Sequence, residues 1–192
     1  MRTREELIEA SDHLHYEIWM MRISSYQLEM YAKEIAKSDT NGLTAYTHTS
    51  HVTISIYSSN APITPPSNSE SKTAEINAHV ESFAIHLRSL LDFFYLDPKI
   101  AHKEDVLAEH YFDNPKDWYK VRPTISEGEL ISIKSRVGTE IAHLSYKRLL
   151  LSVADKLWPF IELKSYVLNA LKEFLLMVDA SLLSDRWKDQ SS

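Results

Sequence analysis

The chain has 192 residues, which suits one domain with a buried core, and it contains no cysteine. The lack of cysteine excludes disulfides, thiolate nucleophiles and cysteine-ligated metal sites. With a net charge of −6, the chain is not expected to attract nucleic acid or anionic lipid over its whole surface. The charged N-terminus and the short apolar runs predict neither a signal peptide nor a membrane span, so we expect a cytoplasmic protein without membrane contact.

The first predicted element is one long helix, or two broken ones, over residues 3–37, because apolar residues recur there at helical spacing. Residues 43–72 are rich in Ser, Thr, Asn and Pro and predict a long irregular excursion. Alternation at Val52, Ile54 and Ile56 predicts a short strand or extended segment, paired with another chain or with a second short segment. The expected core residues of the helix are Leu7, Leu14, Ile18, Met21, Leu28, Met30 or Tyr31, and Ile35.

A second helix is predicted over residues 73–96, where it ends at Asp97–Pro98. Residues 99–125 mix charges, prolines and aromatics, which predicts a partly ordered connector that packs its aromatic rings on the helices. The expected core face of the helix consists of Ile76, Val80, Phe83, Leu87, Leu90 or Leu91, and Phe94.

Two further helices are predicted in the last third of the chain. One begins after Ser126, a capping residue with Glu129 three positions on, and reaches about residue 148. Gly138 lies inside it at a cost of about 1 kcal/mol relative to alanine, so we expect another helix to approach closely there. The last helix is predicted over 158–183, with Pro159 in its first turn. The expected core residues are Leu130, Ile133, Val137, Ile141 and Leu144, then Ile161, Val167 or Leu168, Leu171, Leu175 and Val178.

These elements predict an all-α protein: one domain over residues 1–192, built as a four- to five-helix bundle with one long irregular insertion at about 43–72. The charge is unevenly distributed along it. Residues 116–148 carry seven Lys or Arg and four acidic residues, a local charge of +3, which leaves −9 for the rest. This net-basic stretch is either the footprint of an anionic ligand or chance clustering on a solvated face.

The stretch "RVGTEIAHLSYKR" begins with Arg136 and contains His143. Seven residues are almost two helical turns, so both side chains would project from one face, about 10 Å apart along the axis. A histidine can act there as general base and an arginine can bind phosphate, which is what metal-independent RNA cleavage requires. The alternative is structural: Arg136 pairs with Glu140 at i,i+4, and His143 bonds to a neighbouring helix.

A second polar cluster is predicted on the helix over 73–96. Glu81, Arg88 and Asp92 share one face, with Tyr95 at its end. Arg88 either pairs with Asp92 at i,i+4, as a link between helices, or reaches across to Arg136 and His143. The nine histidines include no HxxxH pair with an acidic partner, and no glycine-rich phosphate loop occurs, so we expect neither a metal nor a cofactor.

Three stretches carry a resemblance to a known family: "HVESFAIHLRSLLDFFY" (79–95), "EDVLAEHYFDNPKDWYKVRP" (104–123) and "EIAHLSYKR" (140–148). They resemble uncharacterised bacterial proteins that are similar in layout to the HEPN superfamily of helical bundles. The resemblance covers about residues 75–150, includes the first helix weakly and leaves out 43–72. The superfamily motif is an arginine and a later histidine with about four to six residues between them, and Arg136 and His143, with six residues between them, match its long end.

The resemblance implies a metal-independent RNA endonuclease of a host-defence or toxin–antitoxin system, with RNA and an antitoxin or other protein as partners. Active members are dimers whose motifs meet at the interface, which would make His143 the general base and Arg136 the phosphate ligand. Arg88, Tyr146, Glu140 and Asp92 would support them. The chain departs from active members at Val137, where a polar residue is common, and in the spacing of Tyr146 from His143. Since many members serve only as binding or dimerisation modules, a non-catalytic interaction module is the alternative.

Overall fold

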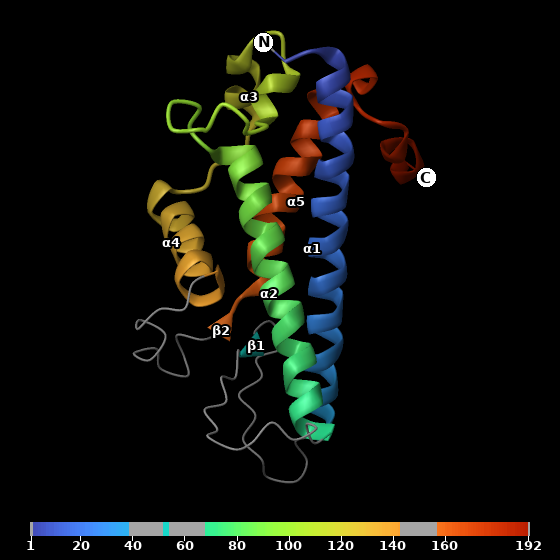
Figure 1. Ribbon diagram of the computed structural model, residues 1–192, viewed down its shortest axis with the longest axis vertical. Helices are drawn as coiled ribbons and strands as arrows, with labels where there is room; N and C mark the ends of the chain where they lie inside the picture. Colours follow the sequence, from blue (N-terminus) through green and yellow to red (C-terminus); the bar gives the residue numbers. More distant parts are fainter. Residues whose placement is uncertain (1, 39–51, 54–67, 143–156, 192) are drawn as a thin grey trace.

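The structure, a computed structural model, describes residues 2–38, 52–53, 68–142 and 157–191; within these ranges only the backbone is described at 35–38, 52–53, 68–70, 140, 142, 157 and 189–191. It confirms an all-α helical bundle. Helix α2 lies between α1 and α4 and is antiparallel to both, whereas α5 packs against α2 and runs in the same direction as α2 (Figure 1). The helices of the described part are α1 (Arg4–Ser38), α2 (Asn68–Tyr95), α3 (Pro115–Val121), α4 (Glu127–Val137) and α5 (Phe160–Met177).

The long contact between α1 and α2 combines large aliphatic side chains with small ones. The predicted core positions Leu7, Leu14, Ile18, Met21 and Leu28 are buried. Of the alternatives Met30 and Tyr31, Met30 is 39% exposed, which excludes it from the core, and Tyr31 is half-buried. Ser24 is also buried, and its hydroxyl donates to Ser82 Oγ of α2 at 2.8 Å. A serine satisfied in this way can replace a larger side chain where two helices lie close together.

α2 begins earlier than predicted. Residues 68–72 are helical rather than part of the irregular excursion. The physical reason lies in the composition, because Pro65 and Pro66 precede this stretch while residues 67–95 contain neither proline nor glycine. The end of α2 at Tyr95, just before Asp97–Pro98, agrees with the prediction.

The connector over 99–125 contains regular structure that the prediction missed. Pro115 occupies the first turn of α3, and the side chain of Asn114 caps it by accepting the Lys116 N–H at 3.2 Å. A single-turn 3-10 helix, η2 (Ala108–Tyr111), precedes α3. The predicted packing of the connector's aromatic rings is confirmed at Tyr111 and Trp118, which are both buried.

Phe174 of α5 is the centre of an aromatic cluster at this end of the bundle. Among the described residues, five aromatic rings have centroids 5.3–6.1 Å from that of Phe174: Phe93, Phe94, Tyr111, Phe112 and Trp118. The polar atoms of these rings are satisfied. Trp118 Nε1 donates to the Phe94 carbonyl at 3.1 Å, and the Tyr111 hydroxyl donates to the Leu7 carbonyl at 2.8 Å.

α4 begins as predicted, because Ser126 Oγ accepts the Glu129 N–H at 3.2 Å. Its predicted continuation to residue 148 is described only as far as Ala142, and the last turn, Gly138–Ala142, is a π-helix. Gly138 has ordinary helical torsion angles, and a Cβ built there would lie 3.6 Å from the nearest guanidinium nitrogen of Arg88. That is ordinary van der Waals contact, so α2 does not require glycine here, contrary to the expected close approach.

The predicted extended segment at Val52 pairs with a second short segment of the chain. Strand β1 (Val52–Thr53) is antiparallel to β2 (Leu157–Trp158), with Val52 opposite Trp158. Ile54 and Ile56, most of the excursion at 43–72 and Leu144 lie outside the described residues.

α5 is shorter at both ends than the predicted helix over 158–183. Trp158 belongs to β2, and Pro159 precedes the first helical residue instead of lying within the first turn. The helix ends at Met177 because Val178 is extended and Asp179 accepts the Ser181 N–H at 2.8 Å, which starts a new 3-10 turn, η6 (Ala180–Leu182). Ile161 and Leu175, predicted in the core, are 41% and 36% exposed.

The C-terminal segment returns to the first helix. The Ser184 N–H donates to Ser11 Oγ at 2.8 Å, and Trp187 Nε1 donates to the Ser11 carbonyl at 3.0 Å. Trp187 belongs to the last 3-10 element, η7 (Asp185–Ser191), and its ring meets that of His15 edge to face.

Candidate functional site

The predicted cluster on α2 joins that helix to α4. Asp92 lies 3.9 Å from Nε of Arg88, the predicted i,i+4 partner, and its other carboxylate oxygen contacts the ammonium of Lys134 on α4. The side chains of Arg88 and Asp92 are 43% and 33% exposed, so water screens these contacts. The structure therefore brings together the supporting residues Arg88 and Asp92, with Lys134 as an additional member.

A groove of about 820 Å³ runs beside this cluster, between the C-terminal half of α2 and α4. Among the described residues, the cations of its lining are Arg88, Arg122 and Lys134. Apolar side chains line much of the remainder, including Ile100 and Ile131, which are 76% and 59% exposed. The groove thus offers positive charge and exposed apolar surface together.

Arg122, one of these cations, is held by a backbone carbonyl and two aromatic rings. Its guanidinium donates to the Phe94 carbonyl at 3.3 Å and lies 5.1 Å from the ring centroids of both Tyr95 and Tyr119. Burial lowers the pKa of Arg122, and the neighbouring Tyr95 and Glu109 oppose that change. Burial likewise raises the pKa of Tyr95, against the effect of Arg122.

Arg136 lies on another side of α4. Its guanidinium carbon is 4.5 Å from the ring centroid of Trp158, which is 1% exposed. Lys134 and Arg136 are two residues apart in regular α-helix, or about 200° around the axis. The structure therefore separates the predicted phosphate ligand from Arg88, Asp92 and the cations of the groove.

The other candidates lie at or beyond the π-turn. Of Glu140 only the backbone is described, and His143 and Tyr146 lie outside the described residues, so the Arg136–Glu140 pair and the role of His143 stay predictions. A π-turn bonds residue i to i+5 and so departs from 100° per residue. The inference that Arg136 and His143 share a face assumed regular α-helix through residues 138–142, and the π-turn removes that assumption.

Two groove cations, Arg122 and Lys134, were missed as site residues, although a signal for them existed. Both belong to the net-basic stretch at 116–148, yet the prediction gave weight only to its Arg–His motif. The histidines described on α2 lie elsewhere: Nδ1 of His86 is 2.8 Å from a carboxylate oxygen of Glu17 on α1. Within the described residues no three His, Asp or Glu side chains gather as ligands of a metal ion would.

Comparisons of the chain with models of protein families, with curated proteins and with solved structures found no match. The HEPN-like resemblance therefore stays a prediction. In the described part of the chain, every helix is too short or too polar to cross a bilayer.

Proposed function

We propose that the protein is a non-catalytic interaction module of the HEPN-like kind, in which the Arg136 segment joins structural elements. The observation that supports it best is the stacking of Arg136 on the buried ring of Trp158. A phosphate ligand must face an open groove that its general base also faces. Arg136 instead covers a core side chain, and about 200° of helix separates it from Lys134 in the groove.

Arg88 and Asp92 have a comparable use in this proposal. Together with Lys134 they form a link of alternating charge between α2 and α4. Such a cluster fixes the position of one helix against another, and it leaves Asp92 engaged by two cations. In this role the polar residues of the candidate site specify the shape of a binding surface and take part in no reaction.

A second candidate function, metal-independent RNA cleavage, is favoured by the groove between α2 and α4. Arg88, Arg122 and Lys134 line it, and such cations bind phosphodiesters. The π-turn directly before His143 is of a kind often found at functional sites. In this candidate, His143 is the base and Arg136 the phosphate ligand.

The test combines RNA cleavage with thermal unfolding. Wild type, His143→Ala and Arg136→Ala are incubated in EDTA with single-stranded and structured RNAs, and the ends of any products are analysed. We expect intact RNA throughout. We also expect Arg136→Ala to lower the free energy of unfolding by about 1–2 kcal/mol, the value of a partly desolvated cation–π contact. Lys99→Ala, at an exposed position, serves as the control and should leave stability unchanged.

Cleavage by wild type that leaves cyclic phosphates and is lost in both variants would overturn this proposal. It would establish the second candidate and assign its base. An Arg136→Ala protein as stable as wild type would also contradict the structural role of the arginine.

A further inference from the structure

Helix α1 carries a second apolar stripe, on the side opposite its core face. Its residues are spaced by three and four positions, as in a heptad seam, and each is 37–58% exposed: Tyr16, Trp19, Ile23, Tyr26 and Met30. At 100° per residue, the stripe is centred about 160° from the buried residues such as Leu14, Ile18 and Met21. The stripe therefore lies outside the core, although the ring of Tyr16 at its N-terminal end meets that of His86 on α2 edge to face, with the ring centroids 5.7 Å apart.

Charged residues continue the same spacing at both ends of the stripe. Glu9 and Asp12 precede Tyr16 by seven and four positions, and Lys33 follows Met30 by three. Glu9 and Lys33 are exposed, and Asp12 lies 3.5 Å from the guanidinium of Arg186. Glu34 lies beside the C-terminal end of the seam, where it pairs with Lys72 of α2 at 2.5 Å. The seam is thus acidic at its N-terminal end and apolar in the middle, and Lys33 gives its C-terminal end a net positive charge.

This polarity makes the stripe complementary to itself in one orientation. Two α1 helices packed antiparallel place Glu9 of one copy near Lys33 of the other, twice, with the aromatic and aliphatic residues between. A parallel pair would place like charges together, which is unfavourable. The charge pattern therefore favours a second copy of the chain, in antiparallel orientation, as the occupant.

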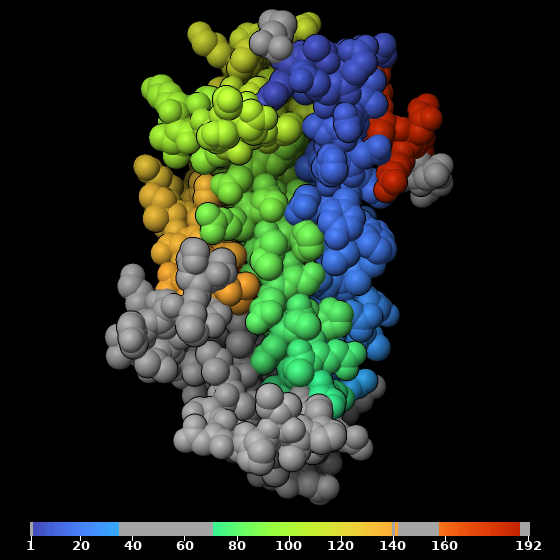
Figure 2. All heavy atoms as spheres, in the orientation of Figure 1, coloured from blue at the N-terminus to red at the C-terminus, as the bar shows by residue number. Residues whose placement is uncertain are grey.

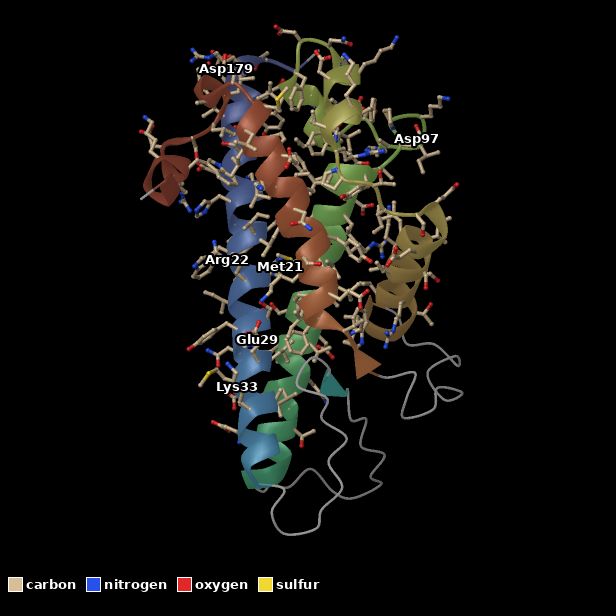
Figure 3. All side chains as sticks on the ribbon, turned by 180° about the vertical axis from the view of Figure 1, so that it is seen from behind. Met21, Arg22, Glu29, Lys33, Asp97 and Asp179 are labelled. Atoms are coloured by element: carbon tan, nitrogen blue, oxygen red, sulfur yellow. The ribbon has the colours of Figure 1, made fainter. Side chains whose placement is uncertain are left out.

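The area available agrees with a specific but modest interface. A fully exposed aromatic ring contributes about 150–250 Å², so the three half-exposed rings offer roughly 100 Å² each. Ile23 and Met30 add to this, and a neighbouring groove extends the surface to Leu168 of α5. Figure 3 shows Met21 and Glu29 on the side of α1 that faces α5, and Glu29 pairs there with Lys164 at 2.6 Å. The stripe alone supplies about half of the roughly 800 Å² per partner of a standard interface.

We infer that the α1 stripe is a homodimer interface, in which the α1 helices of two copies pack antiparallel along Tyr16, Trp19, Ile23, Tyr26 and Met30. The inference rests on the proposed function, because it names the partner of the interaction module. Figure 2 shows α1 and α4 on opposite sides of the molecule. A dimer through α1 therefore keeps the two Arg136 segments apart, whereas the HEPN-like resemblance implies motifs that meet at the interface.

The first experiment is sedimentation equilibrium over a range of concentrations. We expect wild type to dimerise and Tyr26→Glu, which buries a charge in the middle of the seam, to weaken dimerisation at least about thirtyfold, as the loss of a hot-spot aromatic does. Ile131→Asp is the matched control, since it changes an equally exposed apolar residue on α4 and should leave the dimer intact. Unchanged circular dichroism and melting temperature would show that each variant is folded.

Charge exchange tests the orientation. Glu9→Lys and Lys33→Glu should each weaken the dimer, by about threefold to tenfold for two exposed ion pairs, and the double variant should restore it. In a parallel dimer neither single variant would create a new repulsion, so single variants without effect would overturn the antiparallel arrangement.

Trp19 reports directly on whether the stripe is covered. The chain has four tryptophans, all in its described part, and Trp118, Trp158 and Trp187 are buried whereas Trp19 is 50% exposed. Acrylamide should quench Trp19 in dilute wild type and in Tyr26→Glu, but not in concentrated wild type. A monomer at every concentration, or a dimer in which Trp19 stays accessible, would overturn the inference. RNA cleavage by a dimer of this kind would overturn the proposed function and leave the interface standing.

Discussion

Asp92 and Phe93 are neighbours in the sequence, yet they hold different parts of the molecule by different means. Phe93 enters the aromatic cluster around Phe174, where buried rings from α2, α5 and the connector meet edge to face. Asp92 contacts Lys134 of α4 and Arg88 of its own helix, and water reaches both contacts. The aromatic end is fixed by shape and burial, whereas the α2–α4 contact depends on screened charge. A substitution at the aromatic end should therefore lower the free energy of unfolding several-fold more than one in the α2–α4 contact.

The largest expected effect comes from removing the centre of the aromatic end. Phe174→Ala should lower the free energy of unfolding by about 3–5 kcal/mol, because it leaves a cavity that five rings line. Urea unfolding followed by circular dichroism measures the change. Leu176→Ala, in the same helix at a side chain that is 68% exposed, is the control and should change stability by less than about 0.5 kcal/mol. Equal losses in the two variants would remove the distinction between cluster and surface.

Gly138 lines the groove, and its replacement by alanine is expected to raise stability. Gly138→Ala should raise the free energy of unfolding by about 0.5–1 kcal/mol, since alanine restricts the unfolded chain and its Cβ would meet Arg88 at an ordinary distance. Gly128→Ala, in the same helix with nothing within 4 Å of the added carbon, is the matched comparison. A loss at Gly138 with a gain at Gly128 would show that the π-turn itself requires glycine.

Neutralising Asp92 tests the polar contact between α2 and α4. Asp92→Asn leaves two cations facing each other and should cost about 1 kcal/mol or less, with the loss reduced in high salt. Unfolding in urea at low and at high ionic strength gives both values. Asp117→Asn, which removes the more exposed i,i+3 pair with Lys120, should have no measurable effect. A loss of several kcal/mol that does not depend on salt would contradict this prediction, because it would mean that water does not screen the contacts of Asp92.

The smallest expected effect depends on pH and acts at the aromatic end. His110 Nδ1 accepts the Leu107 N–H at 3.1 Å, and burial together with the charge of Arg2 lowers the pKa of His110 below its ordinary value of 6.5. The unfolded chain then binds the proton more readily than the folded chain, so stability is complete above pH 6.5 and falls as the pH drops below it. Melting temperatures measured from pH 8 to pH 5 should show this decline. His110→Gln should reduce it and His13→Gln, at an exposed position, should not.

Periodicity predicted the core most successfully on α2. Val80, Phe83 and Leu87 are buried as predicted. Ile76, also predicted in the core, is half-buried, and Ile85, outside the predicted stripe, is 49% exposed. Periodicity failed for Met30, because α1 has apolar residues on two opposite faces and a run of apolar positions does not say which face is buried. Buried serines such as Ser24 complete the true core face, and a hydrophobic pattern cannot detect them.

The candidate site was predictable only within one helix. The pair Arg88–Asp92 follows from i,i+4 spacing, and the structure contains it. The partner that joins it to α4, Lys134, depends on how two helices pack, which the spacing within either helix does not determine. The π-turn over Gly138–Ala142 departs from the 100° per residue of an α-helix, and the sequence around Gly138 contains no signal that predicts it. For that reason the relation of Arg136 to His143 could not be derived from their separation.

The contact between Ser11 and the C-terminal segment has a consequence for synthesis. Ser11 Oγ accepts the N–H of Ser184, a residue translated 173 positions later, and its carbonyl accepts from Trp187. Proteins are made from the N-terminus at about 5–20 residues per second, so this part of α1 stays uncovered on the ribosome for roughly ten seconds or longer. During that interval the surface around Ser11 and His15 is accessible to other molecules near the nascent chain. It is covered only after Ser184 and Trp187 have been synthesised.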